Sequence, residues 1–227
     1  MNLDFSIVIN SLPYLWQGMK YTLQLTATSA VGGLFFGTLL ALARLSSYKI
    51  LSNTAAGYVN LMRSIPLVLV IFWFFFLVPL IAQGITGAER PIQIGAERTA
   101  MITFILFEAA YFCEIMRAGI QSIPRGQVYS AYALGLTYGQ SMRLVILPQA
   151  FRNMIPVLLT QTIILFQDTS LVYVISATDF VGAASKIAQR DSRLIEMYLF
   201  VAVVYFVLCY TLSYMVKRLQ KRIAVIR

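Results

Sequence analysis

The sequence predicts an all-α polytopic membrane protein with five transmembrane helices. Hydrophobic residues make up 59% of its 227 residues and charged residues only 12%, whereas about a quarter of the residues of a soluble domain are charged. Five apolar stretches are long enough to cross a bilayer, which takes roughly 20 residues per helix. They lack the short alternating pattern of barrel strands, and helices satisfy their own backbone hydrogen bonds in lipid.

The five expected spans lie at about 20–43, 58–82, 98–119, 154–176 and 195–216. The segment before them, 1–19, has neither the basic start nor the small-residue cleavage site of a signal peptide. We expect one membrane domain over 20–216, with a long polar connection at 120–152 and a basic tail at 217–227. This length leaves no room for a soluble catalytic domain as well.

The first span carries Gly33 and Gly37. A spacing of four residues places both glycines on one helix face, where small residues let two helix backbones approach closely. We therefore expect a close helix–helix contact along this face.

The second span opens at Arg63-Ser64-Ile65-Pro66. Proline removes a backbone donor, and the freed groups need another partner in lipid. An interrupted helix is one way to present polar backbone to a transported solute. Arg63 can attract a carboxylate or anchor the helix end at the membrane surface, and the sequence leaves both open.

The third span contains two carboxylates, Glu108 and Glu114. A charge inside a span costs at least about 2.5–3.5 kcal/mol, so such residues are functional candidates. Glu114 and Arg117 are spaced i,i+3 and are expected to form a structural pair on one helix face. Glu108 lines a pathway or bonds a neighbouring helix, and the sequence does not separate these two roles.

The connection at 120–152 is longer than a simple turn requires. The small residues from Ser130 favour a short helix, which Gly135 can end in a left-handed conformation. Residues 138–145 favour a second helix, which Pro148 is expected to stop. Two short helices joined at a glycine form a compact knob, which fits a groove on another protein or lies on the membrane as an interfacial hairpin.

The fourth span carries Gln161 and Asp168. Seven residues separate them, so they share a helix face at roughly 10 Å along the axis. The Asp168 carboxylate can accept hydrogen bonds from an ammonium group, and the Gln161 amide can donate to a carboxylate. The alternatives are an ion pair between spans for Asp168 and a helix–helix hydrogen bond for Gln161.

Basic residues sort the connections and give the expected orientation. Three segments hold basic residues and no acid. The connection between the first two spans has Arg44, Lys49 and Arg63, and the one between the third and fourth spans has Arg117, Arg125, Arg143 and Arg152. The C-terminal tail has Lys217, Arg218, Lys221, Arg222 and Arg227. Lys and Arg favour the cytoplasmic side. We expect an outward-facing N-terminus and a cytoplasmic C-terminus.

Several motifs resemble those of one transport family. Tyr129-Ser130-Ala131, Gly135, Val145 and Leu147-Pro148 have the spacing of the cytoplasmic EAA loop of ABC importer permeases, with Tyr129 at the usual glutamate. The phrases RSIPLV, FEAAY, LPQAF and FQDTSLVYV resemble the polar amino acid branch, and within it the glutamate/aspartate importer permeases.

The resemblance implies a type I ABC importer permease fold with a cytoplasmic coupling helix, in a bacterial inner membrane. It implies import of polar amino acids, with glutamate and aspartate as the expected substrates, driven by a separate ATPase. The implied coupling residues are Ser130, Ala131, Gly135, Val145, Leu147 and Pro148, and the implied substrate residues are Asp168, Gln161, Arg63, Ser64, Pro66, Thr169 and Ser170.

The resemblance also implies the partners. They are an ABC ATPase dimer that binds the ATP, a second permease subunit, an extracytoplasmic amino acid-binding protein and membrane lipid, but no nucleic acid. We expect no cofactor and no metal in this chain, which lacks a Gly-rich phosphate loop.

Two other function classes compete with this reading. An ion-coupled secondary amino acid transporter would have inverted repeats and no docking knob. An intramembrane enzyme would need a metal cluster or a nucleophile–base pair, and the sequence offers neither with persuasive spacing and has no histidine. We therefore expect a transport subunit and not an enzyme.

Overall fold

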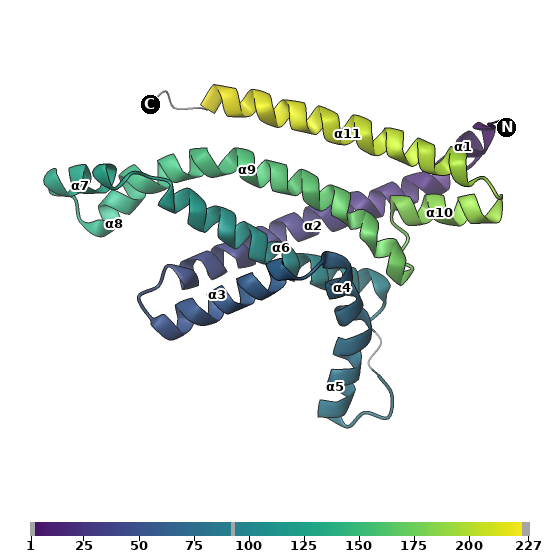
Figure 1. The fold of residues 1–227 in the computed structure, drawn as a ribbon, viewed down its shortest axis with the longest axis horizontal. Coiled ribbons are helices and arrows are strands. Elements are labelled where there is room, and N and C mark those ends of the chain that lie inside the picture. Colours follow the sequence, from purple (N-terminus) through teal and green to yellow (C-terminus); the bar gives the residue numbers. More distant parts are fainter. Residues whose placement is uncertain (1–2, 92–93, 224–227) are drawn as a thin grey trace.

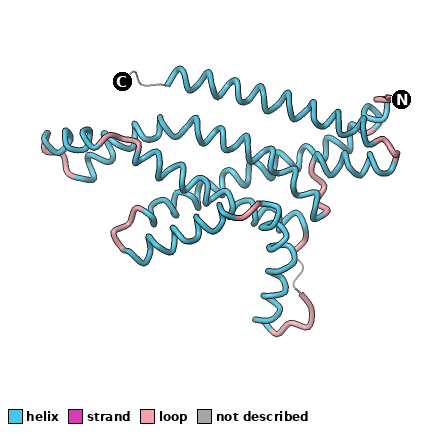
Figure 2. Tube along the Cα trace, viewed as in Figure 1, coloured by secondary structure: helices cyan, strands magenta, loops and turns pink. Residues whose placement is uncertain are grey.

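The computed structural model describes residues 3–91 and 94–223, and within these ranges every regular element is helical. Figure 2 shows this along the chain trace. Among the described residues, five helical stretches are long and apolar enough to cross a membrane: Leu12–Arg44, Leu67–Thr86, Ala96–Gln121, Tyr138–Ile175 and Leu194–Ile223. The predicted fold class is confirmed.

Four long helices form the body of the molecule: α2 (Leu12–Arg44), α6 (Ala96–Gln121), α9 (Leu147–Asp168) and α11 (Leu194–Ile223). In Figure 1 they run roughly alongside one another, and α3 (Lys49–Ser64) packs on α2 and α6. Helices α1 (Ser6–Asn10) and α10 (Phe180–Arg190) lie at the end that holds the N-terminus. The C-terminal end of α11 lies toward the opposite end (Figure 1).

Glycines on α2 bring it against α6. A β-carbon at Gly33 would lie 2.9 Å from the Cβ of Glu108, and one at Gly37 would lie 2.9 Å from the Ala109 carbonyl oxygen. Both separations are too short for a real β-carbon. The close contact expected from the glycine spacing is therefore present, and it places the backbone of α2 directly over Glu108.

The segment expected as the second span, 58–82, is divided by a break. Helix α3 ends at Ser64, Ile65 is extended (φ −113°, ψ 134°), and α4 (Leu67–Phe72) begins after Pro66. Proline pushes the residue before it out of the helical region, which explains the break. A π-helical turn, η1 (Trp73–Leu77), joins α4 to α5 (Val78–Thr86), and this arm projects away from the body (Figure 1).

The connection between α6 and α9 contains two short helices, α7 (Arg125–Ala133) and α8 (Tyr138–Ser141). Pro148 was expected to end the second helix, and this expectation is wrong. A π-helical turn, η2 (Met142–Ile146), leads from α8 directly into α9, and Pro148 lies in the first turn of α9. The wider turn accommodates the proline ring, and the Gln149 side-chain amide donates to the Val145 carbonyl at 2.9 Å.

Helix α10 is joined to α2 at its N-terminus, where the Phe180 N–H donates to the Thr22 hydroxyl at 3.0 Å. It follows a 3-10 helix, η3 (Thr169–Ile175), and begins at the buried cap residue Asp179. The Asp179 carboxylate accepts hydrogen bonds from the backbone N–H of Val181 at 3.1 Å and of Gly182 at 2.8 Å. Burial raises the pKa of this carboxyl to about 6.

Candidate functional site

A cavity of about 420 Å³ lies where the end of α3 meets α6 and α9. Polar groups from all three helices reach it, and those that matter here are Arg63, Tyr111, Glu114, Ser122, Asn153 and Gln161. The remaining lining is largely apolar, as in many small-molecule sites. Two residues predicted from the sequence to bind a solute, Arg63 and Gln161, therefore share one cavity.

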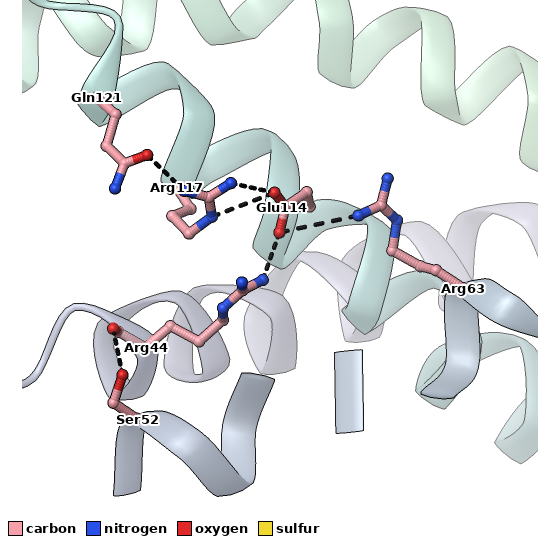
Figure 3. Close-up of polar contacts among 6 residues, drawn as sticks. All are labelled: Arg44, Ser52, Arg63, Glu114, Arg117 and Gln121. Atoms are coloured by element: carbon pink, nitrogen blue, oxygen red, sulfur yellow. Dashed lines mark hydrogen bonds and ion pairs between the residues drawn. The ribbon is translucent and has the colours of Figure 1, made fainter. Parts of the chain in front are cut away.

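Glu114 of α6 gathers arginines from three helices (Figure 3). The guanidinium of Arg117 donates to one carboxylate oxygen, with its Nε at 3.2 Å. Arg44, at the end of α2, donates to the other oxygen. The predicted Glu114–Arg117 pair is confirmed, and the structure extends it into a link between helix ends that lie far apart in the sequence.

Arg63 is the least engaged member of this cluster. Its Nη1 lies 3.9 Å from the Glu114 carboxylate, at the limit of an ion pair, and 39% of its side chain is exposed. The guanidinium lies over the Tyr111 ring at 5.4 Å from the ring centroid, a geometry that attracts a cation to the face of an aromatic ring. One carboxylate serves three arginines, so Arg63 keeps donors available to an anion in the cavity.

Gln161 of α9 is bonded to Glu108 of α6. Its Nε2 donates to the two carboxylate oxygens of Glu108 at 3.3 and 3.2 Å. Glu108 is fully buried and does not line the cavity. Of the two roles left open for Glu108, the structure shows the bond to a neighbouring helix, and it shows the helix–helix hydrogen bond considered for Gln161.

Asp168 lies at the C-terminal end of α9, half-buried and outside the lining of the cavity. Within residues 3–91 and 94–223, no donor bonds its carboxylate and no cation pairs with it. The ion pair considered as the alternative for Asp168 is thus not seen in this part of the chain. An unpaired carboxylate in an apolar helix is costly to keep, which singles it out as a candidate for binding.

The other predicted substrate residues surround the helix ends and do not line the cavity. The hydroxyl of Ser64 donates to the Asn60 carbonyl at 2.6 Å and that of Thr169 to the Phe166 carbonyl at 2.7 Å. Pro66 precedes α4, and Ser170 follows Thr169 in η3.

Sequence reasoning missed Tyr111, Ser122 and Asn153 as cavity residues. Tyr111 and Glu114 are three residues apart and so lie on one face of α6, which a helical projection could have related. Asn153 donates to the Ser122 hydroxyl at 3.0 Å across α9 and the end of α6. No local pattern in the sequence indicates this contact between Asn153 and Ser122.

The second candidate site is the knob formed by α7 and α8. Gly135 has φ of 77°, and its N–H donates to the Tyr132 carbonyl at 2.9 Å while that of Leu136 donates to the Ala131 carbonyl at 3.1 Å. These two bonds form a Schellman motif, which ends α7 at a left-handed residue. Thr137 and Gln140 cap α8 reciprocally.

The knob has a fixed interior and an apolar exterior. Ala131 is buried, whereas Ser130 is exposed. Three large side chains are turned outward: Tyr129 (63% exposed), Leu134 (81%) and Tyr138 (68%). Val145 and Leu147 are half-buried and Pro148 is exposed where the knob joins α9. An exposed apolar surface of this kind is typical of a protein–protein contact.

Comparison with known proteins finds a family and several relatives that this chain resembles. A family model described as "Binding-protein-dependent transport system inner membrane component" matches residues 33–225. The chain is 52% identical over 221 residues to a glutamate/aspartate import permease protein, GltK, of Escherichia coli O157:H7, covering 97% of this chain and 98% of that protein. It is 32% identical over 223 residues to the arginine transport system permease protein ArtQ of Bacillus subtilis (strain 168), covering 98% of each.

Solved structures show the same fold. A crystal structure of an amino acid ABC transporter with histidines superposes with a TM-score of 0.89 at 30% identity, covering 98% of this chain and 100% of that chain. An inward-facing structure of the MetNI methionine ABC transporter superposes with a TM-score of 0.72 at 21% identity, covering 95% of this chain and 99% of that chain. The second likeness shows the fold alone.

Proposed function

Because the chain belongs to the family of binding-protein-dependent transport system inner membrane components, we propose that it is the permease subunit of an ATP-driven importer of polar amino acids. Its substrates are glutamate and aspartate. The observation that carries the proposal is the 52% identity to a glutamate/aspartate import permease over 97% of this chain. The chain itself is a transport subunit and not an enzyme, and a separate ATPase hydrolyses the ATP.

The knob is the part that receives force from the ATPase. Its exterior presents Tyr129, Leu134 and Tyr138, and its hinge is held by the two backbone bonds around Gly135. A rigid, apolar projection transmits a displacement of the ATPase to α6 and α9, between which the knob lies. A secondary transporter has no use for such a surface, so this observation favours the ATP-driven alternative.

The orientation follows from the ends of the body. The knob and the basic C-terminal end of α11 lie toward one end of the molecule in Figure 1, and α1 and α10 lie toward the other. Basic residues favour the cytoplasmic side. In this proposal the N-terminus faces outward, where a binding protein delivers the amino acid, and the C-terminus is in the cytoplasm of a bacterial inner membrane.

The translocation route is completed by a second permease subunit, identical or related. The arm from α4 to α5 leaves the body (Figure 1), and its large apolar side chains are exposed, among them Phe76, Leu80 and Ile85. Five spans in one body do not easily enclose a route for a polar solute. A second permease packed against the arm closes that route.

The cavity holds the amino acid during its passage. Arg63 donates to a substrate carboxylate. Of the three arginines that share Glu114, its guanidinium lies farthest from that carboxylate and is the least neutralised. Asp168, unpaired within the described ranges, accepts from the substrate ammonium group as the helices rearrange. Gln161 contacts the substrate between them, and the helix break at Ser64 and Pro66, with Thr169 and Ser170, borders the route.

Reconstitution tests the proposal. The chain is placed in proteoliposomes with its ATPase, its binding protein and any second permease. Uptake of labelled glutamate should require ATP and should be reduced by unlabelled aspartate more than by arginine. If this chain by itself moves glutamate down an ion gradient, the secondary-transporter reading replaces this one. If arginine competes best, the proposed substrate class is wrong.

A further inference from the structure

We propose that Glu108 is a positioning residue, which turns the Gln161 amide so that its carbonyl oxygen, and not its nitrogen, faces the transported amino acid. Gln161 then reads the substrate ammonium group, and the substrate carboxylates are left to Arg63. This inference rests on the proposed function, and it assigns the specificity of that same cavity.

The bond between the two side chains fixes the orientation of the amide. Both oxygens of Glu108 accept from Nε2 of Gln161, at 3.3 and 3.2 Å. In this arrangement the nitrogen end of the amide faces Glu108, whose two oxygens act as acceptors. The carbonyl end is then directed away from Glu108, and no hydrogen bond to Oε1 from any described residue is present.

Glu108 is held firmly enough to direct another side chain. It is fully buried, and the backbone of α2 passes directly over it because position 33 is a glycine. Phe112, one turn further along α6, is packed against the same glycine. A buried carboxylate without a donor would be very costly in this setting, so the bond to Gln161 is strongly maintained.

The orientation has a consequence for recognition. Gln161 lines the cavity of about 420 Å³ together with Arg63. A carbonyl oxygen attracts an N–H donor and repels a carboxylate, so an amino acid in the cavity turns its ammonium group toward Gln161 and its carboxylates toward Arg63. This differs from the expectation based on the sequence alone, in which Gln161 donates to a substrate carboxylate. Asp168, which lies outside the cavity lining, accepts from the same ammonium group only after the helices rearrange.

A double-mutant cycle tests the inference. Binding of labelled L-glutamate is measured on the assembled permease–ATPase complex without the binding protein, for the parent, Glu108→Leu, Gln161→Leu and the double variant. Each single variant should weaken binding about tenfold, the loss of a hydrogen bond to a charged group. The double variant should bind no more weakly than either single variant, because Glu108 acts through Gln161.

Two further variants separate positioning from general damage. Glu108→Gln keeps an acceptor for the Gln161 amide and should restore binding to within about threefold of the parent. Thr160→Val is the control and should leave binding unchanged. Among the described residues, the Thr160 hydroxyl bonds only the Pro156 carbonyl of its own helix, at 2.9 Å.

The outcomes separate a failure of the positioning role of Glu108 from a failure of the proposed function. If Gln161→Leu weakens binding but Glu108→Leu does not, or if their effects add, the positioning role is overturned and the proposed function stands. If Gln161→Leu leaves binding unchanged, Gln161 is not a substrate contact and the inference falls with it. If the parent complex binds neither glutamate nor aspartate, the proposed function itself fails.

Discussion

Replacing Gly135 with valine should weaken the coupling between ATP hydrolysis and amino acid uptake. Gly135 has φ of 77°, a left-handed conformation that residues with a β-carbon adopt at a cost of about 1–2 kcal/mol. Among the described residues other than its chain neighbours, no atom lies within 4 Å of where a β-carbon at this position would be. The penalty is therefore conformational and not steric, and it falls on the hinge that joins α7 to α8.

The size of the effect follows from that penalty. A penalty of about 1–2 kcal/mol lowers the ratio of molecules with the α7–α8 turn formed to molecules with it unformed about 5–30-fold. The two backbone bonds that define the hinge, from Gly135 to Tyr132 and from Leu136 to Ala131, are weakened together. We expect a several-fold fall in the number of amino acids imported per ATP hydrolysed.

The assay compares uptake with ATP hydrolysis in proteoliposomes that contain the whole complex. Gly135→Asn is the first control, because asparagine tolerates the left-handed conformation. Gly139→Ala is the second, because Gly139 lies in α8 with a negative φ and open space around it. Both controls should keep the parental ratio. If Gly135→Val also keeps it, the hinge does not carry the coupling.

Three further predictions concern the site and the packing. Asp168→Asn should lower the rate of uptake at least tenfold while the complex still assembles, and normal uptake kinetics would exclude an ammonium contact there. Gly37→Ala should cost about 1–3 kcal/mol relative to Gly57→Ala, because a β-carbon at Gly37 meets the backbone of α6, whereas one at Gly57 meets nothing within 4 Å in the part of the chain that the structure describes; equal melting temperatures would contradict this. Asp179→Asn should raise the melting temperature more at pH 7.5 than at pH 4. The folded pKa of Asp179, about 6, exceeds its usual 3.8, so stability falls as the pH rises between these values, and asparagine caps the helix without a charge; a pH-independent difference would refute the reasoning.

The sequence predicted the helices and their turns well because those signals are local. Apolar length gave the number of spans, Gly33 and Gly37 gave a close helix contact, and the spacing of Glu114 and Arg117 gave an ion pair that the structure contains. The error at Pro148 was also local. A proline by itself predicts the end of a helix. Here the π-helical turn before Pro148 lets the helix continue, and no residue pattern predicts that turn.

The sequence by itself determined the fold class, because hydrophobic length and backbone chemistry in lipid allow few alternatives. It also determined the knob, because Gly135 and the residues around it carry their own turn geometry. Only the tertiary structure decided that Gln161 bonds Glu108, 53 positions away, and that Arg44 and Arg63 converge on Glu114. Such contacts depend on the rotation and depth of each helix against its neighbours, and these quantities are fixed by packing between helices and not by any pattern within one.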